Sequence, residues 1–228
     1  MPLSTAFINS CNTIFGMLGM ELGADQLIDT SESFGFNSEL PLDIRSIASS
    51  IPSAASFEFD VPGLAQTAIG QRDVRATPLQ MALAAAAIAN DGEIMVPYLV
   101  QEVFNAEAVV QKSTEPVVWL RATSPSAAAA LTDLMEGVVT SGTGKRASVP
   151  GVRMAGKTGT AEVPDAAPHA WFVGFGPVAA AADDPQIAIA VVVESGGDAG
   201  EAATGGTVAA PIAQLVFAEF FGVGQESP

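Results

Sequence analysis

Residues 155–161 read AGKTGTA, and this stretch decides the fold class of the 228-residue chain. Its small residues fit a strand in the core, yet Lys157 lies in the middle of them. Burial of an ammonium group costs free energy unless the group faces a cleft or an anion. Gly159 lets a ligand approach the strand backbone closely. The pattern predicts a ligand-binding strand, and the alternative is an edge strand whose Lys157 extends into water.

Two further strand-like runs follow this stretch. The three predicted strands cover residues 152–161, 171–176 and 187–194, and the short connections between them favour an antiparallel meander. Glycine-rich residues 196–206 predict a mobile loop, and residues 208–221 predict an amphipathic helix that lies on the sheet. The predicted fold class is therefore α+β.

The first 140 residues are expected to form the mainly helical lobe of the same single domain, and residues 141–228 its sheet strands and last helix. Predicted helices cover residues 13–22, 25–33, 78–89 and 125–139. Thr77-Pro78 is typical of a helix start, and Gln80 stands where a capping box needs it. Residues 38–57 predict a long loop, and residues 94–111 predict a small hairpin or an extended segment.

Composition excludes several classes of function. The chain has 9 lysine and arginine against 25 aspartate and glutamate, and this net charge of −16 argues against a nucleic-acid partner. With one cysteine, Cys11, and one histidine, His169, we expect no disulfide, no metal ion and no cofactor. No apolar run reaches the ~18 residues of a membrane span, and the first residues do not resemble a signal peptide.

Positive charge is concentrated in one window of this acidic chain. Residues 137–161 contain no aspartate or glutamate, but they hold Lys145, Arg146, Arg153 and Lys157, four of the nine basic residues. A local positive potential attracts an anionic ligand, such as a carboxylate, even when the whole protein is negative. The alternative for at least one of Lys145 and Arg146 is an ordinary surface charge at a loop.

A second polar cluster, Ser10-Cys11-Asn12, precedes the first predicted helix. Alone it indicates little, since the side chain of Ser10 or Asn12 could simply cap that helix. Cysteine is more often a small buried apolar residue than a nucleophile, and no histidine is near Cys11 in the sequence to activate it.

Together the two clusters resemble a known motif set. Ser-x-Asn at residues 10–12 and Lys-Thr-Gly-Thr at residues 157–160 are similar to two of the three motifs of the penicillin-binding proteins and serine β-lactamases. Flanking stretches resemble class B penicillin-binding proteins, the membrane-anchored D,D-transpeptidases of peptidoglycan synthesis. These stretches are residues 68–71 (AIGQ), 76–81 (ATPLQM), 142–144 (GTG) and 171–175 (WFVGF). The resemblance implies an antiparallel sheet flanked by a helical lobe.

The resemblance implies a catalytic role for three residues of the two motifs. Ser10 would pass a proton to the leaving group, and Asn12 would help to hold the substrate amide and the lysine of the family's third motif. Lys157 would keep the site electropositive and assist the proton transfer through Ser10.

It also implies that the strand itself binds substrate. Thr158 and Thr160 would bind the terminal carboxylate of a D-Ala-D-Ala stem peptide or of a β-lactam. The Thr160 N–H would be one donor of the oxyanion hole, and Gly159 would keep the strand open to the substrate.

The third motif of the family, S-x-x-K, is absent from the sequence. None of the three lysines, Lys112, Lys145 and Lys157, has a serine three places before it. In the family this motif holds the acylated serine and precedes Ser-x-Asn, as do two strands of the sheet. We therefore expect residues 1–228 to be one incomplete transpeptidase domain, with the nucleophile and a membrane anchor in an upstream segment.

The implied function is the cross-linking of peptidoglycan stem peptides by serine acyl transfer at the outer face of the bacterial cytoplasmic membrane. β-Lactams would bind the same site, and a glycosyltransferase of the elongation or division machinery would be a partner. A serine β-lactamase is the first alternative, which efficient β-lactam hydrolysis would favour. The second is a non-catalytic remnant that binds stem peptides or a partner, which a full-length product without S-x-x-K would favour.

We predict that the 228-residue chain alone forms no acyl-enzyme, because it contains no S-x-x-K serine. After incubation with fluorescent penicillin, denaturing electrophoresis of the purified chain should show no more label than a heat-denatured sample. Covalent labelling of the isolated chain would contradict the expectation that the nucleophile lies in another segment.

Overall fold

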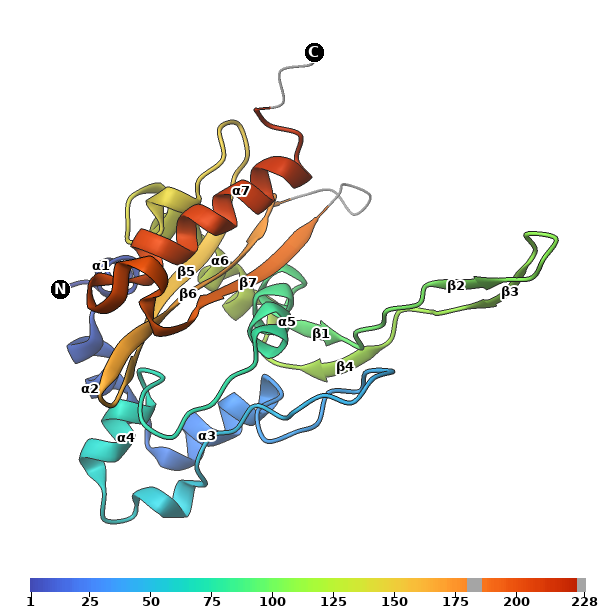
Figure 1. The fold of residues 1–228 in the computed structure, drawn as a ribbon. Coiled ribbons are helices and arrows are strands. Elements are labelled where there is room, and N and C mark those ends of the chain that lie inside the picture. Colours follow the sequence, from blue (N-terminus) through green and yellow to red (C-terminus); the bar gives the residue numbers. More distant parts are fainter. Residues whose placement is uncertain (180–185, 225–228) are drawn as a thin grey trace.

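The computed structural model describes residues 1–179 and 186–224, and a three-stranded sheet forms the middle layer of its main body (Figure 1). β5 (Ala155–Val163), β6 (Ala166–Gly176) and β7 (Ile187–Val193) lie in that order, and both pairings are antiparallel. The predicted meander is therefore confirmed. β5 begins three residues later than predicted, because Val149 and Val152 form a separate bridge, and β6 begins five residues earlier.

The α-helices are those predicted, with two additions. The described ranges also hold three 3-10 helices that were not predicted, Ala54–Phe57, Lys145–Ala147 and Glu194–Ala202, and the last of these covers much of the predicted loop over residues 196–206. The described residues form α1 (Leu3–Ile8), α2 (Asn12–Leu22), α3 (Ala24–Ser33), α4 (Val61–Thr67), α5 (Pro78–Ala89), α6 (Pro125–Thr140) and α7 (Ala210–Phe220). The sequence pattern does not predict α1 and α4, which have only six and seven residues. A short π-helix over Gly205–Ala209 precedes α7, so the last α-helix begins later than predicted. None of the helices in the described ranges is long and apolar enough to cross a membrane.

α5 begins as the sequence predicts, but without a capping box. The Thr77 hydroxyl accepts a hydrogen bond from the Gln80 N–H at 3.2 Å, which satisfies one free donor of the first turn. The Gln80 side chain does not return this bond. It is fully buried, and its Nε2 donates to the carbonyl of Phe34 at the end of α3. The capping-box prediction is wrong because a long-range contact between two helices takes the Gln80 amide instead.

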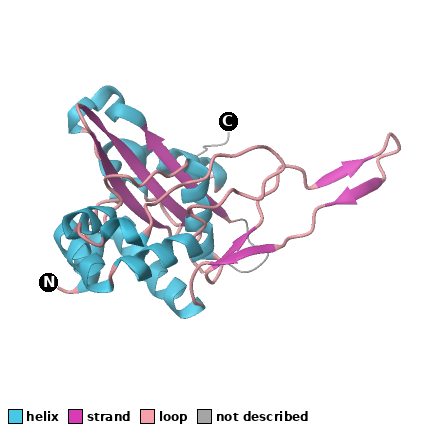
Figure 2. Ribbon diagram, turned by 90° about the horizontal axis from the view of Figure 1, so that it is seen from below, coloured by secondary structure: helices cyan, strands magenta, loops and turns pink. Residues whose placement is uncertain are grey.

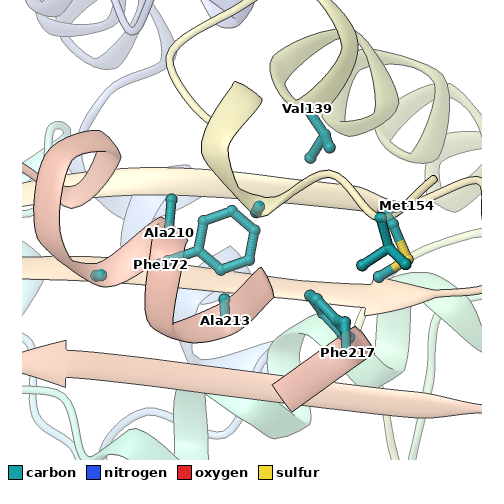
Figure 3. Close-up of a cluster of buried hydrophobic side chains, with 9 residues drawn as sticks. Val139, Met154, Phe172, Ala210, Ala213 and Phe217 are labelled. Carbon is teal, nitrogen blue, oxygen red and sulfur yellow. The ribbon is translucent and has the colours of Figure 1, made fainter. Parts of the chain in front are cut away.

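Helices cover both faces of the sheet, α7 on one face and α5 and α6 on the other (Figure 1). Phe172 and Phe175 stand three residues apart on β6, so their side chains point to opposite faces. Phe172 is fully buried beneath α7, with its ring 6.5 Å from that of Phe217, and Phe175 packs with Ala85 and Met135. Figure 3 labels the cluster around Phe172, which includes Val139, Met154, Ala210, Ala213 and Phe217.

A long ribbon projects from the body (Figure 2). β1 (Glu93–Met95) pairs with β4 (Val118–Arg121), and β2 (Glu102–Phe104) pairs with β3 (Val110–Ser113), both antiparallel. The predicted hairpin over residues 94–111 is only partly right, because Ile94 pairs with Leu120, outside that segment. Residues 1–140 therefore hold four strands beside their helices.

Gly205 sets how closely the turn before α7 approaches the sheet. A Cβ on Gly205 would meet the Trp171 carbonyl, and it would lie 2.6 Å from the oxygen and 2.9 Å from the nitrogen of Gly159. These are main-chain atoms of two paired strands, which cannot turn aside as a flexible side chain can. Only glycine fits where this turn packs against β5.

We predict that Gly205→Ala lowers the free energy of unfolding of the whole protein by about 2 kcal/mol, since overpacking of a well-packed site costs roughly 1–3 kcal/mol. Urea unfolding followed by circular dichroism measures the change. Gly16→Ala is the control, because a Cβ on Gly16 would lie 3.5 Å from its nearest neighbour, the Ala65 carbonyl oxygen. Equal stability of the two variants would contradict the close approach at Gly205.

Candidate active site

Ser10 and Lys157 come together from distant parts of the chain. Ser10 lies in the turn between α1 and α2, and Lys157 lies on β5. The Lys157 Nζ donates a hydrogen bond to Ser10 Oγ at 2.8 Å, across 147 positions of sequence. The structure thus brings the two polar clusters of the sequence into contact.

The turn that presents Ser10 has an unusual backbone conformation. Ser10 has a φ of +54°, in the left-handed region that few residues other than glycine adopt. Such a conformation costs about 1–3 kcal/mol and is concentrated at functional sites. The alternative of a helix cap is wrong for Ser10 and Asn12, because the N-cap residue of α2 is Cys11 and no side-chain cap bond forms.

Lys157 is a half-buried ammonium group with hydrogen-bond acceptors beside it. Besides Ser10 Oγ, its Nζ donates to the Thr158 carbonyl at 2.8 Å, and it lies 5.9 Å from the centre of the Phe7 ring. None of the ion pairs among the described residues involves Lys157. Burial lowers the pKa of Lys157 to about 8, because a poorly solvated site disfavours the charged form. Lys157 therefore does not extend into water, although β5 is an edge strand of this sheet, as that alternative expected.

A pair of hydroxyl groups lies one residue beyond Lys157. The Thr158 side chain is buried, and its Oγ1 is 2.6 Å from Oγ1 of Thr143. Thr143 follows α6 and is exposed, and its N–H donates to the Ile8 carbonyl at 3.3 Å. The sequence pattern indicates no separate role for Thr143, although the GTG stretch at residues 142–144 contains it. Two adjacent hydroxyls can donate to the oxygens of one carboxylate.

Thr160 turns its main-chain groups toward the open edge of β5, the edge away from β6. Its carbonyl accepts a hydrogen bond from Gln71 Nε2 at 2.9 Å. In an antiparallel strand the N–H and C=O of one residue point to the same side. The Thr160 N–H therefore also faces the open edge. The sequence pattern indicates no role for Gln71, although it ends the AIGQ stretch at residues 68–71.

Asn12 and Gly159 make few contacts. Asn12 is the exposed first residue of α2, and its side chain makes no hydrogen bond to any residue that the structure describes. Gly159 lies between Thr158 and Thr160, and a Cβ on it would be 3.3 Å from the Trp171 Cβ. The expected role of Asn12 in holding a substrate amide stays a prediction. The expected role of Gly159 in letting a substrate approach the strand closely also stays a prediction.

The basic window contributes less positive charge to the site than its composition predicts. Arg153 binds Glu136 through two hydrogen bonds of 2.7 Å, and Arg153 lowers the pKa of the Glu136 carboxyl mainly by this hydrogen bonding. Arg146 donates to the Thr207 carbonyl at 3.3 Å, and Lys145 is exposed. The expectation is wrong for Arg153 because Glu136 immediately precedes the acid-free window. Among the window's basic residues, the one that touches Ser10 is Lys157.

The chain is similar to known proteins over nearly its whole length. Residues 1–218 match the family model of the penicillin binding protein transpeptidase domain. Peptidoglycan D,D-transpeptidase PbpA of Mycolicibacterium smegmatis is 42% identical over 222 residues, which cover 96% of this chain and 43% of that protein. The chain therefore spans less than half the length of this relative.

Two solved structures share the fold. Penicillin-binding protein A of M. tuberculosis, as a ceftriaxone acyl-enzyme complex, has a TM-score of 0.86 and 40% identity, over 95% of this chain and 48% of that chain. The D,D-transpeptidase domain of a peptidoglycan glycosyltransferase from Eggerthella lenta has a TM-score of 0.83 and 37% identity, over 98% of this chain and 54% of that chain. The expected α+β fold is therefore confirmed over most of the chain.

We predict that the free energy of unfolding rises with pH because of Lys157. Its pKa falls from 10.5 to about 8 on folding, so between these values the unfolded chain binds more protons than the folded one. The destabilisation from the buried charge is then fully present below pH 8 and is relieved as pH rises toward 10.5. Urea unfolding of the whole protein at about pH 7 and about pH 10 should show the rise, and Lys157→Met should reduce it. An equal pH slope in both proteins would contradict the burial of this ammonium group.

Proposed function

Because the chain belongs to the penicillin-binding protein transpeptidase family, we propose that it supplies the substrate-binding strand and the proton-transfer groups of a peptidoglycan D,D-transpeptidase. The observation that carries this proposal is the 2.8 Å hydrogen bond from Lys157 Nζ to Ser10 Oγ, beside the hydroxyls of Thr158 and Thr143. In the proposed reaction a serine attacks the carbonyl between the two terminal D-alanines of a stem peptide. The last D-alanine leaves, and the amine of a second stem peptide then takes the acyl group.

The terminal carboxylate of the stem peptide binds at the threonine hydroxyls of β5. Thr158 and Thr160 donate to it, and Thr143 supports the Thr158 hydroxyl at 2.6 Å. The Lys157 ammonium attracts the carboxylate, since none of the described ion pairs neutralises this charge. A β-lactam carboxylate fits the same groups.

Different groups of this site stabilise the developing negative charge and transfer the proton. The Thr160 N–H, on the open edge of β5, stabilises the oxyanion of the tetrahedral intermediate. Ser10 Oγ gives its proton to the departing amine, and Lys157 restores it through their hydrogen bond. A lysine pKa of about 8 suits this exchange near neutral pH, and Asn12 is proposed to hold the substrate amide.

The acylated serine is proposed to lie outside these 228 residues, since they contain no S-x-x-K. Coverage of only 43% of the PbpA relative supports this assignment. The whole protein would work at the outer face of the cytoplasmic membrane, beside a glycosyltransferase that makes the strands to be cross-linked. β-Lactams would acylate the same serine, and a related penicillin-binding protein A was solved as a ceftriaxone acyl-enzyme.

We predict that Ser10→Ala in the whole protein slows acylation by penicillin about 100-fold, since a general acid–base group contributes roughly 10²–10⁴-fold. The rate of labelling by fluorescent penicillin measures the effect, and the far-UV circular dichroism spectrum should stay unchanged. Ser148→Ala is the matched control, because Ser148 is an exposed serine without a side-chain hydrogen bond to any described residue. It should be labelled at the unchanged rate.

The persistence of the label separates the proposed function from its alternatives. An acyl-enzyme that keeps its label for hours fits a transpeptidase, whereas fast penicillin hydrolysis with loss of label would indicate a β-lactamase. Equal rates for Ser10→Ala and the unchanged protein would contradict the role of Ser10. A whole protein that penicillin never labels would contradict the proposed function and favour a binding remnant.

A further inference from the structure

Phe7 belongs to the same turn as Ser10, at the end of α1. The Phe7 carbonyl accepts a hydrogen bond from the Ser10 N–H at 3.0 Å. The Cys11 N–H donates to the Ala6 carbonyl at 2.9 Å, and Ser10 has a φ of +54°. These features define a Schellman motif, in which Ser10 takes the left-handed position that is usually glycine. The last turn of α1, which contains Phe7, therefore fixes where Ser10 lies.

The Phe7 side chain contacts the hydrogen-bond partner of Ser10. The Lys157 Nζ lies over the Phe7 ring, 5.9 Å from its centre, and it donates to Ser10 Oγ at 2.8 Å. The negative face of an aromatic ring attracts an ammonium group. Phe7 thus holds Ser10 through its main chain and faces Lys157 with its ring. One residue of α1 therefore contacts both groups of the proton-transfer pair.

Two further contacts fix the Phe7 ring in place. It meets the ring of Phe15 on α2 edge-on, with the ring centres 5.9 Å apart and the planes at 73°. It also packs against the buried cluster that contains Ala85, Met135 and Phe175. Side chains packed closely on several sides have little freedom to move. The ring therefore cannot swing away from Lys157 without losing both of these contacts.

The Phe7 ring belongs to the apolar surroundings that keep water from the Lys157 ammonium. Attraction by a ring face alone would favour the charged form and raise the pKa of Lys157. The pKa is instead lowered to about 8, and the cause is burial. None of the ion pairs among the described residues includes Lys157, so no carboxylate offsets this loss of hydration. Exclusion of water therefore outweighs the attraction of the ring.

We propose that Phe7 is a positioning residue for the proton transfer, whose ring covers the Lys157 ammonium and holds it against Ser10. The inference rests on the proposed function, in which the Ser10 hydroxyl gives its proton to the departing amine and the Lys157 ammonium replaces it along the 2.8 Å bond. Phe7 has no proton to exchange, so it acts only through these two residues. Its ring keeps the ammonium aligned with Ser10 and keeps water from competing for that bond.

The test uses the variant Phe7→Leu of the whole protein and fluorescent penicillin as the probe. Leucine keeps an apolar contact with the buried cluster, but it has no ring face and leaves room for water beside Lys157. We expect the second-order acylation rate constant to fall by at least about 10-fold, with nearly all molecules still labelled at saturation. The alkaline limb of the pH–rate profile, where Lys157 loses its proton, should move upward from about pH 8, because better hydration favours the ammonium form. A purely structural role would instead lower the labelled fraction and leave this limb in place.

Phe15→Leu is the matched control, since it removes the other ring of the same aromatic pair. The ring that lies over Lys157 is that of Phe7, so Phe15→Leu should acylate at the unchanged rate, with its alkaline limb in place. A second measurement does not depend on activity. The pKa of Lys157, followed by NMR of isotope-labelled lysine and assigned through Lys157→Met, should rise in Phe7→Leu and stay unchanged in Phe15→Leu.

An unchanged acylation rate or an unchanged Lys157 pKa in Phe7→Leu overturns the inference. An equal change in Phe15→Leu also overturns it, because loss of the aromatic pair alone would explain the effect. If Phe7→Leu fails to fold while Phe15→Leu folds, the ring serves the fold alone, and the inference is again overturned. If penicillin labels none of the proteins, the proposed function fails and this inference fails with it, whereas labelling without a Phe7 effect refutes this inference alone.

Discussion

The hydrogen bond between Lys157 and Ser10 is the contact on which the rest of the site depends. An ammonium group on a strand inside the fold needs acceptors, and the turn between α1 and α2 supplies one at 2.8 Å. That turn reaches β5 because α1 packs against the end of α6, where a Cβ on Gly142 would collide with the Ile8 carbonyl. The same Ile8 carbonyl accepts from the Thr143 N–H. One close helix contact therefore places both the partner of Lys157 and the partner of Thr158.

Side chains from three separate turns and loops hydrogen-bond to residues of β5 along its open edge. Ser10 contacts Lys157 from the first turn, Thr143 contacts Thr158 from the end of α6, and Gln71 contacts Thr160 from the loop after α4. The three contacts come from three different turns and loops, so each fixes the strand relative to a different part of the chain. Groups held in this way need little rearrangement when charge develops, which is the main source of electrostatic catalysis.

Local patterns predicted the sheet and the main helices, and the K-T-G-T and S-x-N motifs pointed to Lys157 and Ser10. The meander was predictable because apolar strands with short connections leave few topologies open. Long-range side-chain bonds were not predictable. Gln80 looked like a capping residue and instead joins α5 to Phe34, and Gln71 reaches Thr160 across 89 positions. The residues next to a glutamine in the sequence do not predict which distant carbonyl group its side-chain amide will bind.

Because the chain carries a large negative charge, we expect Lys157 to attract an anion only at short range. A net charge of −16 repels anions, but in physiological salt that repulsion is screened within about 8 Å, and Lys157 acts inside this distance. A carboxylate beside Lys157 would raise its pKa back above about 8, because an opposite charge favours the ammonium form. In the proposed reaction, substrate binding therefore charges the lysine. Departure of the D-alanine, which takes the carboxylate with it, lowers that pKa again and frees the proton. In that proposed reaction, the burial that lowers the pKa of Lys157 would also couple its proton to the arrival and departure of substrate.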